Sequence, residues 1–195
     1  MGLSLFPAIL MAYAIARFNF SGKELLFRGI VSLMAVPSVV VLIPLYREMV
    51  QIHLVNTHFG LILIYAGMTL PFSLYLLTSF FVSMPSEIVD AALIDGCSSF
   101  QILIRIYAPL SRPAIITVMV VNFTWLWGEL LVTMVFMQSD KLKTLMPGML
   151  TYVTARSTDV PLVMASLMMA TVPTLIIYLL GLKYFVKGMM AGFLK

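Results

Sequence analysis

Long apolar runs separated by short polar segments are the feature that most constrains how this chain can fold. Of the 195 residues, 62% are hydrophobic and only 10% are charged, which is far from the composition of a soluble domain. Because a helix needs about 20 apolar residues to cross the hydrocarbon core, each long run predicts one membrane span. The predicted spans are residues 2–16, 25–46, 60–82, 114–137 and 162–184. The sequence therefore predicts an all-α membrane protein with about five transmembrane helices in a single domain, residues 1–195.

Residues 84–113 form the least apolar part of the chain, although predicted spans flank them on both sides. Pro85 suits the first position of a short helix, where its missing N–H is not needed. Glycine readily takes the left-handed conformation that ends helices, so we expect this helix to stop at Gly96. Three of the chain's eight acids lie here, the first two near the positive end of the helix: Glu87, Asp90 and Asp95.

A second short helix is expected to follow directly. Ser98 and Gln101 have the spacing of a capping box, in which each side chain bonds the other residue's backbone N–H. Residues 100–107 are then apolar apart from Gln101 and Arg105, so this helix needs to be covered by other elements. We interpret residues 84–113 as a two-helix loop at the membrane surface, with Cys97 as a small packing residue inside it.

The distribution of Lys and Arg predicts the orientation in the membrane, because these residues are enriched in cytoplasmic segments. If the C-terminus is cytoplasmic, the inside segments carry eight: Arg17, Lys23, Arg28, Arg105, Arg112, Lys183, Lys187 and Lys195. The outside segments carry four: Arg47, Lys141, Lys143 and Arg156. This imbalance places the 84–113 loop and the C-terminus in the cytoplasm.

Several classes of function find no support in the residues. No GxxxxGK[ST] motif is present to bind the phosphates of ATP, so any ATP hydrolysis is expected in a separate subunit, and no catalytic residue or cofactor is expected here. His53 and His58 are five residues apart without a third nearby ligand, so we expect ordinary loop histidines rather than a metal site. The basic residues lie at the ends of apolar runs, which argues against nucleic acid as a partner.

The order of residues in the 84–113 loop resembles the "EAA loop" of the membrane subunits of bacterial ABC importers. That consensus reads EAA, three residues, G, nine residues, I, one residue, LP. This chain keeps five of those residues in register and has Asp90 for the Glu and Ala108 for the Leu. The kept residues are Ala91, Ala92, Gly96, Ile106 and Pro109.

The rest of the chain resembles the maltose-type sugar permeases of this group. AYAIARFNFSGK resembles their joint AYALARFxFxGR, and IPLY, NTHFGLIL, LVMASLMMATVP and KYFVKGMMAGFLK resemble later segments. Such permeases usually have six spans, and this chain starts part-way through the second. Since residues 2–16 are too few for a full span, we expect one further helix to precede them in a complete permease fold.

The resemblance implies a permease subunit of an ATP-driven importer in the bacterial inner membrane, carrying a sugar or sugar derivative. The implied partners are ABC ATPase subunits, a second permease subunit and an extracytoplasmic solute-binding protein, besides the membrane lipid. The residues implied to couple to the ATPase are Glu87, Asp90, Ala91, Ala92, Asp95, Gly96, Ile106 and Pro109. Two alternatives remain open: a non-transporting or decayed permease that acts as a membrane scaffold, and a secondary carrier, which would need ion-coupling residues and repeated broken helices.

Glu129 is the only acid inside a predicted span, and such acids face protein or a water-filled path. At 1.5 Å per residue it lies roughly 25 Å above Arg112, near the outer surface. Trp127, Gly128 and Glu129 resemble the family's WNE, which leaves two interpretations open: a pathway-lining pair, or an interfacial acid beside an aromatic anchor. Three methionines at roughly helical spacing, Met164, Met168 and Met169, suggest either an adaptable binding face or a lipid-facing or packed surface.

Overall fold

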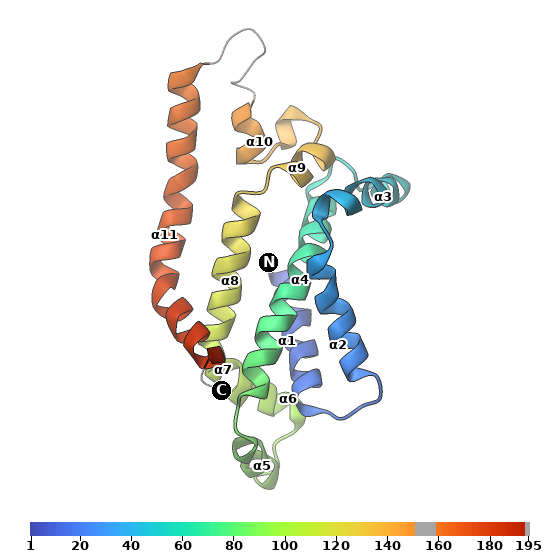
Figure 1. Cartoon of the computed structure of the whole chain (residues 1–195), viewed down its shortest axis with the longest axis vertical. Helices are drawn as coiled ribbons and strands as arrows, with labels where there is room; N and C mark the ends of the chain where they lie inside the picture. Colours follow the sequence, from blue (N-terminus) through green and yellow to red (C-terminus); the bar gives the residue numbers. More distant parts are fainter. Residues whose placement is uncertain (151–158, 194–195) are drawn as a thin grey trace.

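The computed structural model describes residues 1–150 and 159–193, with side chains up to Gly181, and within these ranges it contains helices and no strands. Long helices lie side by side, and short helices lie at the two ends of the molecule (Figure 1). One end carries α5 (Ser86–Ile94) and α6 (Ser99–Ile102). The other carries α3 (Ser38–Gln51), α9 (Leu131–Phe136) and α10 (Leu145–Met149). The all-α prediction is confirmed.

The closest packing of long helices joins α1 (Gly2–Arg17) to α4 (His58–Val82). Ser4, Ala8 and Ala12 recur at every fourth position of α1 and are buried. Side chains this small let helix backbones approach closely, which is how helices associate inside membranes. Larger buried side chains from α4, Leu74, Leu77 and Phe81, complete this core.

The third long helix, α8 (Arg112–Trp127), is tied to α4 by a buried hydrogen bond. Asn122 Nδ2 donates to Ser73 Oγ at 2.9 Å, and Ser73 Oγ donates in turn to the Thr69 carbonyl at 2.7 Å. The buried side chains of Asn122 and Ser73 therefore both have a partner, as an apolar interior requires. These hydrogen bonds between uncharged side chains fix the position of α8 along α4.

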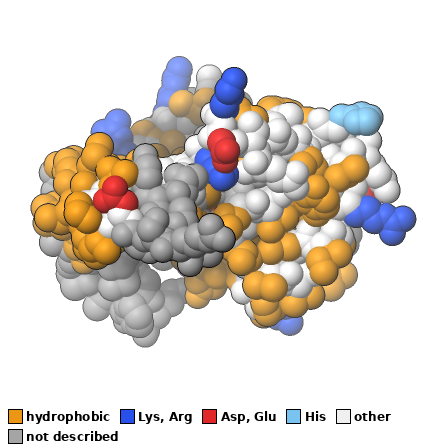
Figure 2. Space-filling view, turned by 90° about the horizontal axis from the view of Figure 1, so that it is seen from above, with side chains coloured by type: hydrophobic (Ala, Val, Ile, Leu, Met, Phe, Trp, Pro, Cys, Tyr) orange, Lys and Arg blue, Asp and Glu red, His pale blue; other side chains and the backbone are white. Residues whose placement is uncertain are grey.

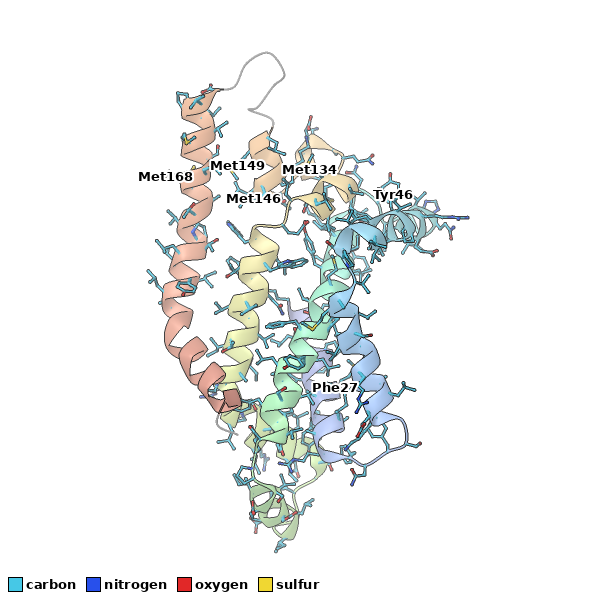
Figure 3. All side chains as sticks on the ribbon, in the orientation of Figure 1. Phe27, Tyr46, Met134, Met146, Met149 and Met168 are labelled. Carbon is cyan, nitrogen blue, oxygen red and sulfur yellow. The ribbon has the colours of Figure 1, made fainter. Side chains whose placement is uncertain are left out.

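The last helix, α11 (Val160–Phe193), lies along α8 on the outside of the group (Figure 1). Its described side chains are mostly exposed, among them Met164, Met168 and Met169; Met168 is labelled in Figure 3. These methionines therefore do not fill the core of this chain. They remain free to face lipid or a partner.

The predicted span 25–46 contains a sharp bend, because its helix breaks at Pro37. The helix α2 (Lys23–Ser32) continues as a short turn, η1 (Leu33–Ala35), and then bends by 104° into α3. Pro37 lacks an N–H and disfavours helical backbone at the residue before it, and Val36 is accordingly extended (φ −82°, ψ 118°). Hydropathy alone does not detect such a break.

The predicted span 114–137 is also interrupted. The helix α8 ends at Trp127, Gly128 to Leu130 form a corner, and α9 begins at Leu131. Beyond it come η3 (Asp140–Leu142) and α10. The structure thus places Glu129 in a corner rather than inside a continuous helix.

Predicted spans 2–16, 60–82 and 162–184 lie inside the continuous helices α1, α4 and α11. By length and composition, α4 and residues 160–181 are long and apolar enough to cross a membrane, whereas α1 is shorter. Two bent pairs raise the number of candidate spans to four if each pair counts as one: Lys23–Ala35 with Ser38–Gln51, and Ser99–Leu110 with Arg112–Trp127. These statements concern the described residues.

Candidate functional site

The short helix α5 ends at the glycine that the sequence predicts. Gly96 has φ +79°, in the region that favours glycine. Its N–H donates to the Leu93 carbonyl and the Cys97 N–H to the Ala92 carbonyl, both at 3.0 Å. These are the two bonds of a Schellman motif. The predicted stop at Gly96 is confirmed, while Pro85 lies one residue earlier than predicted, directly before the helix.

The second half of the loop begins with the predicted capping box. The Gln101 N–H donates to Ser98 Oγ at 3.3 Å, and the Ser98 N–H donates to Gln101 Oε1 at 2.8 Å. After α6 the backbone widens into a π-helical turn, η2 (Leu103–Tyr107), and then forms α7 (Ala108–Leu110). A π turn inserts an extra residue into a helix and is frequent at functional sites.

The eight residues predicted to couple to an ATPase separate into an outward and an inward group. Five are exposed on α5 and at its end: Glu87, Asp90, Ala91, Asp95 and Gly96. Ala92 is buried at 6% exposure, and Ile106 packs against the same core cluster, while Pro109 is exposed on α7. The adjacent residues Ala91 and Ala92 thus have opposite positions, one on the surface and one in the core.

The exposed side of α5 also carries apolar side chains that the sequence analysis did not single out. Ile94 is 87% exposed and Leu93 is 52% exposed. Among the described residues, the ion pairs are Arg28 with Glu24 and Lys143 with Asp140, so the three carboxylates of the loop form no ion pair there. We call Glu87, Asp90, Ala91, Leu93, Ile94 and Asp95 the α5 surface.

The other predicted pair, Trp127 and Glu129, lies at the opposite end of the molecule and makes contacts within the chain. Glu129 Oε2 accepts from Tyr65 Oη at 2.7 Å, and Glu129 Oε1 accepts from the Val132 N–H at 2.8 Å. The carboxylate therefore caps the first turn of α9, where negative charge is favourable, and joins it to α4. Trp127 faces away from this group, since its Nε1–H donates to the Ala170 carbonyl of α11 at 2.9 Å.

Further contacts at this end hold α9 to the α3–α4 segment, and sequence reasoning missed them. Asn56, in a left-handed conformation (φ +61°), donates its N–H to the Phe136 carbonyl at 2.8 Å. Its Oδ1 accepts from the Ser139 N–H at 3.0 Å. Tyr46 on α3 accepts from Gln138 Nε2 at 3.0 Å, and Figure 3 shows Tyr46 at the end of the molecule that carries Met134. A positive φ at a non-glycine residue cannot be read from the sequence.

The surface of this end is shown in Figure 2, where charged side chains are scattered among large hydrophobic areas. One ion pair there joins Lys143 Nζ to Asp140 Oδ1 at 2.6 Å. The hydrogen bond from this ammonium, together with its charge, lowers the pKa of the Asp140 carboxyl. Charged side chains therefore cover only a small part of the described surface in Figure 2, where hydrophobic areas lie beside polar side chains and backbone.

A cavity of about 590 Å³ lies where α2 bends into α3 beside α4. Its lining is apolar apart from Ser38 and the indole of Trp125, and includes Pro37 and Pro71. It contains no carboxylate, and no group of three His, Cys, Asp or Glu that could hold a metal occurs in the described part of the chain. This lining does not supply the convergent polar groups that a sugar site needs.

Comparison with known proteins shows the family. Residues 5–190 match the family described as "Binding-protein-dependent transport system inner membrane component". An ABC transporter permease protein of Caldicellulosiruptor sp. is 40% identical over 193 residues, 99% of this chain and 70% of the relative. The sulfoquinovosyl glycerol transport system permease of Agrobacterium fabrum is 33% identical over 193 residues, 99% of this chain and 68% of its own length.

A further relative and a solved structure agree with these matches. The melibiose/raffinose/stachyose import permease of Bacillus subtilis is 31% identical over 187 residues, 95% of this chain and 68% of the relative. The structure of a bacterial ABC transporter involved in alginate import has a TM-score of 0.80 at 23% identity, covering 94% of this chain and 69% of that one, which shows a shared fold. The chain belongs to the family of binding-protein-dependent ABC importer permeases, the inner-membrane components of these transport systems.

Proposed function

We propose that this permease subunit couples to an ABC ATPase through the α5 surface and helps to import a sugar or sugar derivative. The observation that carries the proposal is the construction of α5. This helix is fixed by a Schellman motif at its end and by the buried Ala92. At one end of the molecule it presents the exposed Ile94 and three carboxylates that form no ion pair among the described residues. A rigid amphipathic helix of this kind suits a groove on a partner protein.

The chemistry of the α5 surface specifies what the partner must offer. Because the carboxylates form no ion pair in the described part of the chain, we expect Arg or Lys residues opposite them on the ATPase. We expect an apolar pocket on the ATPase to receive Ile94 and Leu93. Ala91 lies between these groups and permits close approach. ATP binding would draw the ATPase subunits together and displace α5 with them, so that the cavity between two permease subunits changes from inward-facing to outward-facing.

A sugar or sugar derivative as substrate is supported by two relatives, which are permeases of a sulfoquinovosyl glycerol transport system and of melibiose, raffinose and stachyose import. The cavity beside Pro37 offers few polar groups, so solute recognition would depend on a second permease subunit and an extracytoplasmic binding protein. The proposed orientation places the α5 surface and the C-terminus in the cytoplasm. This agrees with the eight Lys and Arg residues assigned to the inside.

The proposal is tested by co-purification of the ATPase subunit with the permease complex from membranes. Ala91→Glu adds bulk and a fourth carboxylate to the α5 surface, and we expect it to reduce the bound ATPase by about tenfold, equivalent to about 1.4 kcal/mol. The matched control is Ser21→Glu, which adds the same charge to the exposed α1–α2 turn at the same end. Undiminished ATPase binding by the Ala91→Glu variant would contradict the proposal.

A further inference from the structure

The side chain of Arg17, at the end of α1, contacts two parts of the 84–113 loop, which we call the coupling loop. Arg17 Nη2 donates to the carbonyl of Met84, two residues before α5, at 3.1 Å. The same guanidinium lies 5.0 Å from the ring centroid of Tyr107, the last residue of η2. One side chain of α1 thus contacts two residues of the coupling loop, Met84 and Tyr107, that are 23 residues apart in the sequence.

Tyr107 is fully buried, and its ring is enclosed by residues from two long helices. The Tyr13 ring of α1 packs edge-on at 5.0 Å between centroids, and the Phe81 ring of α4 does so at 5.1 Å. Since Tyr13 and Arg17 are four residues apart, they lie on one face of α1 and contact the same ring. We call Tyr13, Arg17 and Phe81 the Tyr107 socket.

The contact in the Tyr107 socket depends on the face of the ring rather than on the hydroxyl. Tyr107 Oη and Arg17 Nε are buried and have no hydrogen-bond partner within the described residues. A guanidinium over an aromatic face is attracted by the electrons of the ring, and more strongly when water is excluded. Removal of the hydroxyl should therefore leave the contact intact, whereas removal of the ring should abolish it.

We propose that Arg17 and Tyr107 are positioning residues that transmit displacement of the coupling loop to α1 and α4. This inference rests on the proposed function, because the ATPase supplies the displacement. A loop moved by the ATPase carries Met84 and Tyr107 with it, and Arg17 makes α1 follow. The π turn ends at the buried Tyr107, while the α5 surface remains exposed, so the loop has one part inside the protein and one part available to the ATPase.

The test measures nucleotide-dependent distances between spin labels in the assembled importer, with the native thiol removed by Cys97→Ser. The distance between labels at Ser99 and Leu25 measures movement of the loop relative to α2. The distance between labels at Phe6 and Met168 measures movement of α1 relative to α11. All four positions are exposed. The probe is ATP without Mg²⁺, compared with the nucleotide-free state, so the identity of the transported solute is not required.

We expect ATP to shift both distances in the otherwise unaltered protein. Arg17→Gln and Tyr107→Leu should keep the loop shift and lose the α1 shift, whereas Tyr107→Phe should keep both. Arg28→Gln is the matched control, because Arg28 is an exposed arginine that forms an ion pair with Glu24 on its own helix, and it should also keep both.

The possible results separate the inference from the proposed function. An α1 shift that persists in Arg17→Gln and Tyr107→Leu would overturn the inference while leaving the proposed function in place. Should the unaltered protein fail to bind the ATPase, or show no loop shift, the proposed function would fail and the inference with it. Since Arg17→Gln keeps the ring packing of Tyr13 and Phe81 on Tyr107, it gives a result even if Tyr107→Leu does not assemble.

Discussion

Gly96 determines how α5 leaves the rest of the loop, because its backbone lies at φ +79°. A side chain costs about 1–2 kcal/mol in this conformation, although nothing would collide with the new Cβ. Gly22, before α2, has φ +85° and equally open surroundings. We predict that Gly96→Ala and Gly22→Ala lower thermal stability in detergent similarly, but that only Gly96→Ala lowers the amount of ATPase bound. Equal ATPase binding by the two variants would contradict a role for the joint.

Glu129 accepts hydrogen bonds from three groups at the end of the molecule opposite α5: Tyr65 Oη, the Val132 N–H and the Thr133 N–H. Hydrogen bonds to a charged group contribute about 1.5–3 kcal/mol. We therefore predict that Glu129→Ala destabilises the protein by at least this amount. Tyr65→Phe, which removes one donor, should cost about 1 kcal/mol. Thermal unfolding in detergent measures both, and an unchanged midpoint for Glu129→Ala would show that the carboxylate does not hold the corner.

Contacts between residues that are close in the sequence were predictable, and contacts between residues far apart in the sequence were not. Gly96 and the pair Ser98 and Gln101 operate within four residues, so spacing alone specified both the helix stop and the capping box. The partner of Glu129 on α4 is 64 residues away. The sequence predicted a role for Arg17 only in the orientation of the chain in the membrane. Its contacts with Met84 and Tyr107 form only when α1 packs against the loop.

The helices themselves were largely predictable from apolar length, but the size of the bend at each proline was not. Apolar residues continue on both sides of Pro37, and the backbone nevertheless turns by 104° there. Pro71, by contrast, does not break its helix, since α4 is continuous from His58 to Val82. Whether a proline breaks a membrane helix depends on the packing around it, which the sequence does not show.

Packing of α11 on α8 requires the absence of a side chain at Gly181. A Cβ there would lie 2.5 Å from Val120 Cγ2, so Gly181→Ala forces the two helices apart at a cost of about 1–3 kcal/mol. Gly29, an exposed residue of α2 with open space around it, provides the control. Gly29→Ala should stabilise the protein by about 0.5–1 kcal/mol through helix propensity. Thermal unfolding of both variants checks this, and stabilisation by Gly181→Ala would contradict the packing.

Across the whole molecule, the two ends differ in what they offer to partners. The end with α5 presents carboxylates that form no ion pair within the described ranges of the chain, whereas contacts within the chain occupy the carboxylate of Glu129 at the other end. An acidic surface that docks on basic residues is screened by salt, because the Debye length is about 10 Å at 0.1 M. We predict that ATPase binding weakens as ionic strength rises and that Asp90→Asn weakens binding and reduces this salt dependence. Titration of the solubilised subunits at several salt concentrations measures both, and salt-independent binding would contradict it.

The central claim is that the α5 surface lies in the cytoplasm and contacts an ATPase. Its most direct test is labelling of Ile94→Cys, in a Cys97→Ser background, with a membrane-impermeant maleimide. The side chain is 87% exposed, so the thiol is accessible wherever the loop faces water. Gln51→Cys on α3, exposed at the opposite end, serves as the control for the outer face.

We predict that Ile94→Cys reacts in inside-out vesicles and not in intact cells, and that bound ATPase protects it, while Gln51→Cys shows the reverse sidedness and no protection. Reaction of Ile94→Cys from outside intact cells would contradict both the orientation and the coupling role of α5.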